Sequence, residues 1–209
     1  VNGDGDNAVW GGADGDTLTV AATAAGANTV GGGDGVDAIT VAGTGNNSIY
    51  GGNDEDNDTI DITGTGNNTV FCGGTDGVNT ITIDDTATGV NTIYNGGGDD
   101  VVNVNGAGAN VLYAGAGDDS FVFDADGAGT IIVESGNGSD EIDGFRIDGT
   151  TFLDLSALGF ADADDVLDSM TNLGDADGDG DERHEMTSRQ ADALEATRAR
   201  SRSLLQMRQ

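Results

Sequence analysis

The residues best suited to chemistry in this chain are carboxylates that recur at a nearly fixed spacing. An Asp or Asn precedes each of seven short apolar segments, and these residues are Asp16, Asp37, Asp58, Asn79, Asp100, Asp119 and Asp140. Carboxylate oxygens are hard ligands, and an excess of them suits calcium. The 38 acidic residues face 7 basic ones, for a net charge of -31. The chain is therefore either disordered or neutralised by cations when it folds.

A second polar series lies between these acids, and its members are Asn7, Asn28, Asn47, Asn68, Asn91 and Asn110. The first series repeats with gaps of 21, 21, 21, 21, 19 and 21 residues. A period near twenty that divides into two turn-and-strand halves predicts a solenoid whose coils each supply two short parallel strands. Gly-rich turns would supply positive φ, and apolar residues come singly because alternate strand residues point inward.

Stacked coils of this kind would bury a narrow continuous core. One predicted wall consists of Val9, Val30, Ile49, Val70, Ile93 and Leu112. The facing wall consists of the pairs Leu18/Val20, Ile39/Val41, Ile60/Ile62, Ile81/Ile83, Val102/Val104 and Phe121/Phe123. Such stacking would explain how a chain with only 36% hydrophobic residues can fold.

The half-turns GGADGDTLTV, GGDGVDAITV and AGAGDDSFVF resemble the nonapeptide G-G-x-G-x-D-x-U-x of the RTX family of bacterial secreted proteins. The resemblance covers about residues 1–145. It implies an all-β fold, a right-handed parallel β-roll (a β-solenoid) of about seven coils, with a C-terminal cap and a short helical tail. It also implies several calcium ions, held between successive turns by acids at the sixth position and by turn carbonyls.

Carried onto this chain, the sixth-position acids are Asp16, Asp37, Asp58, Asp100, Asp119 and Asp140. Further carboxylates nearby are Asp14, Asp34, Asp54, Asp56, Asp76, Asp99 and Asp118. The Asn series and Asn79 depart from the family pattern. Those turns either bind calcium weakly or are held by side-chain amide hydrogen bonds, so calcium is expected chiefly along one edge.

The segment after the roll, residues 140–160, resembles the closing segment of RTX domains in serralysin-type proteases and alginate epimerases. The resemblance implies a cap near a signal for type I secretion, and the residues expected to cover the core are Ile142, Phe145, Ile147, Phe152, Leu153, Leu155 and Leu158. We divide the chain into a calcium-binding roll (1–145), a cap with a short helix over Ala161–Met170 and an acidic loop (146–181), and an Arg-rich tail that is helical or disordered (182–209).

The acidic loop DADGDGDERHEM has the opening of an EF-hand, with acids at Asp175, Asp177 and Asp179 and glycine at Gly180. The twelfth place holds Met186, where the motif needs a bidentate Glu. This loop is either a calcium site or a solvated acidic segment. The chain also starts at Val1 inside a repeat, which indicates a fragment or a processed product.

Catalysis is not expected. The chain has one histidine, His184, and no lysine, which nearly excludes triads, Schiff bases and histidine-based metal sites. Acids that recur in every coil fit structural ligands better than a unique acid/base pair, and Cys72 has no accompanying base and reads as a packing residue. The strong acidity makes nucleic acid and anionic membranes poor partners, so no nucleic acid is expected. No apolar run is long enough to insert into a bilayer.

Two outward faces are candidate binding surfaces. An aromatic series follows the core residue of the Asn half-coils, and its members are Trp10, Tyr50, Phe71, Tyr94 and Tyr113, with Gly31 in the second coil. It either stacks for stability or binds a protein, a second subunit or a glycan. The opposite face carries Thr17, Thr19, Thr40, Thr59 and Thr80, which resembles ice-binding RTX adhesin modules.

These features predict a secreted, non-catalytic protein of the bacterial exterior or cell surface that folds on meeting extracellular calcium. It would serve as a folding and secretion module or as a structural or adhesive element. The alternative is an ice- or glycan-binding adhesin module that uses the Thr or the aromatic face.

Overall fold

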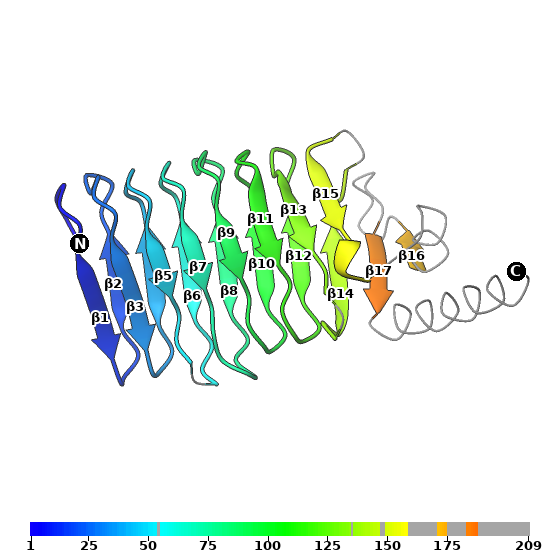
Figure 1. Cartoon of the computed structure of the whole chain (residues 1–209), viewed down its shortest axis with the longest axis horizontal. Coiled ribbons are helices and arrows are strands. Elements are labelled where there is room, and N and C mark those ends of the chain that lie inside the picture. Colours follow the sequence, from blue (N-terminus) through cyan, green and yellow to red (C-terminus); the bar gives the residue numbers. More distant parts are fainter. Residues whose placement is uncertain (54, 135, 147–148, 159–170, 175–182, 188–209) are drawn as a thin grey trace, which may run out of the picture.

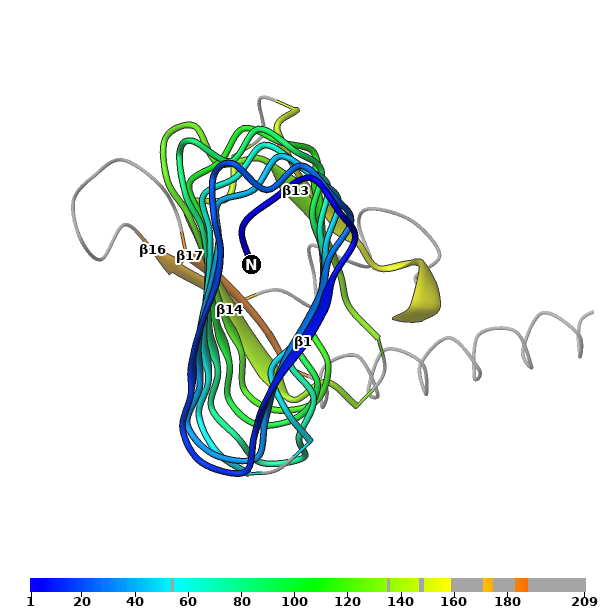
Figure 2. The same cartoon turned by 90° about the vertical axis from the view of Figure 1, so that its left-hand side faces the viewer.

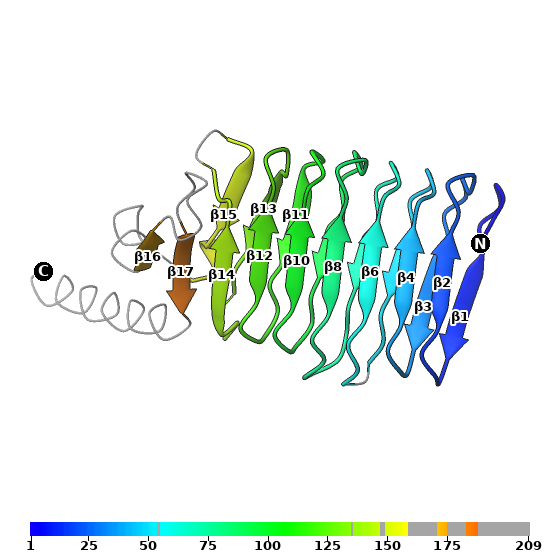
Figure 3. The same cartoon turned by 180° about the vertical axis from the view of Figure 1, so that it is seen from behind.

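The computed structural model of the chain describes residues 1–53, 55–134, 136–146, 149–158, 171–174 and 183–187. Two sheets face each other along the length of a solenoid, as Figure 1 shows from one side and Figure 3 from behind. Each coil contributes one strand to each sheet, and seven coils are formed by β1 to β14. The predicted parallel β-solenoid is therefore confirmed.

The first sheet has eight strands in the order β1-β3-β5-β7-β9-β11-β13-β15. Their bounds are β1 Ala8–Gly12, β3 Thr29–Gly33, β5 Ser48–Tyr50, β7 Thr69–Phe71, β9 Thr92–Tyr94, β11 Asn110–Tyr113, β13 Gly129–Ile132 and β15 Thr151–Asp154. All pairs within this sheet are parallel.

The second sheet has nine strands in the order β16-β17-β14-β12-β10-β8-β6-β4-β2. Their bounds are β2 Thr17–Val20, β4 Ala38–Val41, β6 Thr59–Ile62, β8 Thr80–Ile83, β10 Val101–Val104, β12 Ser120–Phe123, β14 Ser139–Asp143, β16 Thr171–Gly174 and β17 Arg183–Thr187. Strands β2 to β14 pair in parallel, whereas β17 pairs antiparallel with β14 and with β16.

The strand register keeps equivalent residues of successive coils in line, so the predicted core columns form. Ile49 pairs with Val70 in the first sheet and Ile60 with Ile81 in the second, and all four side chains are buried. Seen end on in Figure 2, the coils superpose around a narrow interior. Val9 and Leu18 are only partly buried because no coil precedes theirs in the structure. The alternation of one inward and one outward residue explains why so few apolar residues suffice.

The C-terminal end of the solenoid differs from the prediction in two respects. Phe152 was expected to cover the core, but it is 53% exposed, because it occupies an outward position of β15 opposite Thr130. Leu158 is buried and Leu153 and Leu155 pack against the core, as predicted. Residues 183–187 were expected in a helical or disordered tail, yet they form β17. The free edge of β14 provides unpaired backbone groups for such a strand.

Several predictions fall outside the described residues. They concern Ile147, the helix over 161–170, the acids Asp175, Asp177 and Asp179 of the EF-hand-like loop, and the tail from residue 188. Met186, at the twelfth place of that loop, belongs to β17. Among the residues that the structure describes, no helix has the length and apolar character needed to cross a membrane.

Candidate functional site

The recurring acids line the inside of the turns that lead from the first sheet to the second. We call Asp16, Asp37, Asp58, Asn79, Asp100, Asp119 and Asp140 the Asp row. Asp16 is partly buried and the other members are buried, with exposed fractions between 1% and 5%. The turn forms in each coil just before a strand of the second sheet, so strand register places one such side chain above the next.

From Asp37 onward, one oxygen of each member holds adjacent coils together. Its Oδ1 accepts a hydrogen bond from the backbone N–H of the equivalent residue in the preceding coil. The six N–O distances run from 2.7 to 3.2 Å along the row. The Asp row is therefore a continuous backbone-to-side-chain ladder.

In the first three coils the second carboxylate oxygen lies against a glycine near the end of the first-sheet strand (Gly11, Gly32 and Gly51). In the second coil a Cβ at Gly32 would collide with Asp37 Oδ2, so only glycine leaves room for that carboxylate. The Oδ2 atoms of Asp100 and Asp119 are buried and have no hydrogen-bond partner among the described residues. A buried charge without a partner is costly.

The electrostatics reflect this burial. Removal from water raises the pKa of Asp100 to about 7, that of Asp119 to about 8 and that of Asp140 to about 7, although hydrogen bonds from the neighbouring coil oppose the shift. For Asp119 the charges of Asp140 and Asp100 add to the effect. These carboxyl groups need either a proton or a cation at neutral pH.

The additional acids predicted as ligands lie elsewhere. The exposed ones are Asp14, Asp34, Asp56, Asp76, Asp99 and Asp118, and Asp54 lies outside the described residues. Asp99 and Asp118 have a structural role, since their Oδ1 atoms accept hydrogen bonds from the N–H groups of Asp118 (2.8 Å) and Ser139 (2.7 Å). Among the described residues, the structure thus separates the proposed ligands into the Asp row, with low exposure, and an exposed rim.

The oxygen atoms present would fit calcium only as a mixed set. Within the described residues, no three His, Cys, Asp or Glu side chains gather as a metal cluster. Adjacent coils stack at the strand spacing of about 4.8 Å, which is close to twice the calcium–oxygen distance of about 2.4 Å. Carboxylates from two coils could therefore share an ion. Turn carbonyls are the other available oxygens: at Gly117 (φ 129°) a side chain would collide with the carbonyl oxygen of Gly98 in the preceding coil.

The opposite turns contain a different polar array, which we call the Asn ladder: Asn7, Asn28, Asn47, Asn68, Asn91 and Asn110. Each Oδ1 from Asn28 onward accepts from the backbone N–H and the Nδ2 of the preceding member. The Nδ2–Oδ1 distances are 2.9 to 3.0 Å. Each Nδ2 also donates to the glycine carbonyl two residues earlier. Hydrogen bonds between amides hold these turns, so that one of the two predicted alternatives is observed.

The predicted aromatic series forms a stack on the outer face of the first sheet, and we call it the aromatic ladder. Ring centroids are 5.8 Å apart for Trp10 and Tyr50, 5.1 Å for Tyr50 and Phe71, 5.0 Å for Phe71 and Tyr94, and 4.5 Å for Tyr94 and Tyr113. Gly31 leaves a gap that the Trp10 ring covers. Stacking accounts for the series, yet Trp10 remains 61% exposed.

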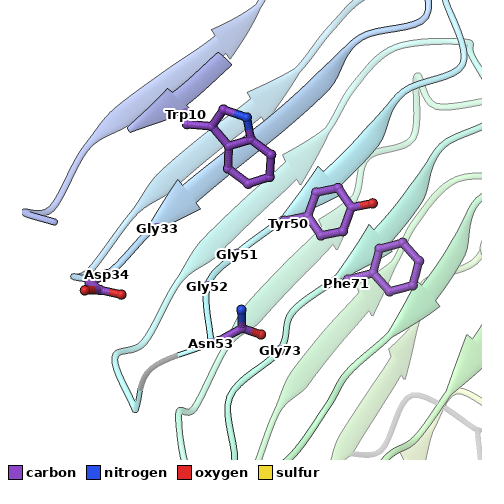
Figure 4. Close-up of a pocket in the computed structure, with 9 residues that line it drawn as sticks. All are labelled: Trp10, Gly33, Asp34, Tyr50, Gly51, Gly52, Asn53, Phe71 and Gly73. Atoms are coloured by element: carbon purple, nitrogen blue, oxygen red, sulfur yellow. The ribbon is translucent and has the colours of Figure 1, made fainter. Parts of the chain in front are cut away.

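A pocket of about 360 Å³ lies beside the first rings of the aromatic ladder. Figure 4 shows Trp10, Tyr50 and Phe71 along one side and Asp34 and Asn53 towards the turn. The backbone of Gly33, Gly51, Gly52 and Gly73 completes the lining. This volume is at the small end of ligand sites.

Sequence reasoning missed three polar residues of the interior, Asn95, Asn137 and Thr151. Asn95 is 1% exposed, and neither its Oδ1 nor its Nδ2 has a hydrogen-bond partner within the described part of the chain. It directly follows Tyr94, at the place that glycine occupies after Tyr50. The presence of Asn where an earlier coil has Gly was the feature of the sequence that could have identified this residue. Cys72, by contrast, is buried in the core as the packing residue that was predicted.

Comparison of the chain with protein-family models, with curated proteins and with solved structures found no match.

Proposed function

We propose that this chain is a calcium-dependent solenoid module of the RTX type that folds when calcium binds along the Asp row and has no catalytic activity of its own. The observation that carries the proposal is the pair of buried, unpartnered Oδ2 atoms of Asp100 and Asp119. In a chain of net charge -31, the folded state concentrates negative charge in its interior. A bound divalent cation would offset that cost.

Calcium is the cation that suits these ligands best. Carboxylate and carbonyl oxygens are hard donors, and a flexible set of six to eight oxygens is what calcium accepts. Because the site exists only when adjacent coils are stacked, the binding free energy becomes folding free energy. Extracellular calcium modules bind at about 10⁻⁴ to 10⁻³ M, so a module of this kind would be unfolded where calcium is scarce and folded outside the cell.

The test is far-UV circular dichroism of the whole chain while calcium is raised from chelator into the millimolar range, with magnesium as a parallel titration. The proposal expects a transition from coil to β-structure with calcium and a weaker response to magnesium, which demands stricter octahedral geometry. A β-rich spectrum that is the same in chelator and in calcium would refute it.

A matched pair of variants locates the effect. The triple variant Asp100→Asn, Asp119→Asn, Asp140→Asn should lose calcium dependence. The control Asp14→Asn, Asp61→Asn, Asp76→Asn removes the same charge from positions that are not buried, and it should keep the calcium response. Equal behaviour of the two variants would indicate that net charge, and not the Asp row, governs folding.

A second candidate role is docking through the aromatic ladder, as a structural or adhesive element. The pocket beside Trp10, Tyr50 and Phe71 favours it, because exposed rings around a hollow are typical of interaction sites. Sedimentation during the same calcium titration tests self-association. Large species that appear in the wild type but not in Trp10→Ala would support docking between copies, whereas monomers throughout would exclude it.

A further inference from the structure

A third inward column lies at the end of each strand of the first sheet, directly facing the Asp row. From the first coil to the seventh it consists of Gly11, Gly32, Gly51, Cys72, Asn95, Ala114 and Val133. In the first three coils the carboxylate of the same coil occupies the space that a side chain would need. A Cβ at Gly11, Gly32 or Gly51 would collide with the Oδ2 of Asp16, Asp37 or Asp58, respectively. Strand register carries the same arrangement along the stack, so we infer that a residue in this column lies beside the Asp-row member of its own coil.

In the fifth coil the two equivalent positions hold polar groups that lack partners. Asn95 stands in the column, and Asp100 is the Asp-row member of that coil. Both side chains are 1% exposed, and Asn95 Oδ1, Asn95 Nδ2 and Asp100 Oδ2 have no hydrogen-bond partner among the described residues. A buried polar group left unpaired costs about 1–3 kcal/mol. A glycine in place of Asn95 would have no side-chain amide and would therefore not incur this free-energy cost.

The surroundings favour a cation between these two groups. Cys72 occupies the column in the preceding coil, and the pKa of its thiol is raised by burial and then by the charges of Asp100, Asp58 and Asp119. The negative charges that add to this shift also attract cations and repel anions. The available donors are an amide oxygen and carboxylate oxygens, which are hard ligands that select calcium over softer metals.

We propose that Asn95 Oδ1 and Asp100 Oδ2 bind one calcium ion inside the fifth coil, at a site that the coils with glycine in this column lack. The inference rests on the proposed calcium-dependent folding and adds a ligand outside the repeated acidic positions. It also explains why the chain places an amide where a small or apolar residue stands in the neighbouring coils.

Native mass spectrometry at saturating calcium tests this inference by counting bound ions in the full chain. Asn95→Ala and Asn95→Gly should each bind one ion fewer than the wild type, and Asn95→Asp should retain it, because a carboxylate oxygen replaces the amide oxygen. Asn110→Ala is the matched control, since Asn110 is also 1% exposed but belongs to the Asn ladder. It should keep the full number of ions. Reactivity of the single thiol, Cys72, checks folding, because that thiol is buried in the folded chain.

Each result has a definite meaning. An unchanged ion count in both Asn95→Ala and Asn95→Gly overturns the inference and leaves a water molecule as the partner of Asn95. Loss of the ion in Asn95→Asp as well overturns the assignment of an oxygen ligand to this position. A wild type that binds no calcium at all refutes the proposed function itself, so the two failures are distinguishable. The glycine variant covers the case in which alanine prevents folding, because glycine occupies the equivalent place in three other coils.

Discussion

The Asn ladder and the Asp row both link adjacent coils through side-chain hydrogen bonds. Their side chains differ only in that Asn carries an NH₂ group where Asp carries a second oxygen. In both rows a side-chain Oδ1 accepts the backbone N–H of the preceding coil, at 3.1 Å for Asn68 and 2.8 Å for Asp119. In the Asn ladder the remaining NH₂ donates to a glycine carbonyl and to the next amide. In the Asp row the remaining atom is a second oxygen, which at Asp119 has no partner within the described residues. One edge is thus complete in itself, and the other needs a cation or a proton.

Asn79 shows that the same turn accepts either an Asp or an Asn side chain. It lies within the Asp row, accepts the N–H of Asp58 at 3.0 Å and donates through Nδ2 to the carbonyl of Gly77 at 3.4 Å. The turn geometry therefore does not dictate which residue is used. Under the proposed function, the choice of Asp over Asn decides whether the edge depends on calcium.

The largest expected effect comes from converting the whole Asp row into amides. Replacement of Asp16, Asp37, Asp58, Asp100, Asp119 and Asp140 by Asn should give a chain that is β-rich in chelator, because every carboxylate that repels its neighbours gains a donor instead. Circular dichroism in chelator and in calcium measures the effect. Continued collapse of the β signal in chelator would show that the difference between the two edges is not the source of calcium dependence.

Acid should act on the Asp row as calcium does. The folded-state pKa values of Asp100, Asp119 and Asp140 are about 7, 8 and 7, above the unfolded value of about 3.9. The folded state therefore binds more protons between about pH 4 and 8, and stability rises as pH falls through this window.

In chelator, the chain should accordingly gain β-structure when the pH is lowered from 8 to about 5.5, still above the isoelectric point of about 4.1. In saturating calcium this gain should disappear, because protons and calcium compete for the same oxygens. A urea midpoint in chelator that falls over the same pH range would contradict the assignment of these carboxyl groups.

Disruption of the Asn ladder should destabilise the fold by a smaller amount that does not depend on calcium. Asn68→Ala removes the Nδ2 bonds to Gly66 and Asn91. It also leaves the backbone N–H of Asn47 without its acceptor, whereas Asn47 Nδ2 loses one of two acceptors and keeps the carbonyl of Gly45. Buried donors without acceptors cost about 1–3 kcal/mol each, so a loss of about 3 kcal/mol is expected in urea denaturation at saturating calcium. Asn68→Asp keeps the acceptor and should lose less, and it should make that edge sensitive to pH as well.

The smallest effect is expected from the outer surface, which belongs to neither row. Trp10→Ala removes one tilted ring contact, at 5.8 Å, from an exposed position. Such a contact contributes about 1 kcal/mol. Urea denaturation should show this loss with the calcium midpoint nearly unchanged. A large shift of that midpoint would connect the aromatic ladder to the metal sites and weaken the contrast between interior rows and outer face.

Periodicity was sufficient to predict the solenoid, its core columns and both polar rows. A fixed repeat forces equivalent residues into register, so Val30, Ile49 and Val70 had to share one wall once the strands paired in parallel. The same reasoning placed Tyr50, Phe71 and Tyr94 in one stack. In a repeat protein the sequence period alone shows which residues lie side by side, whereas in other folds this information comes from tertiary contacts.

Features outside the repeat could not be predicted from periodicity. The exposure of Phe152 and the pairing of β17 with β14 depend on how the last coil ends, where no register carries over from a neighbour. The split of the acids into a buried row and an exposed rim also escaped the sequence, since Asp14 and Asp16 are both turn acids two residues apart. The direction of each side chain depends on turn dihedral angles, which glycines such as Gly117 leave open.

The hydrogen bonds of the two buried rows all point the same way along the solenoid. The donor belongs to the earlier coil and the acceptor to the later one, from Asn7 to Asn28 at one edge and from Asp16 to Asp37 at the other. At the far end Asn110 donates to the carbonyl of Ala128 in the seventh coil. The backbone N–H one residue further along the chain points the other way, since Thr29 donates to the carbonyl of Asn7 and Ala38 to that of Asp16 in the preceding coil. Each inner coil is therefore bound by both of its neighbours, so order that starts at one coil can spread in both directions along the stack.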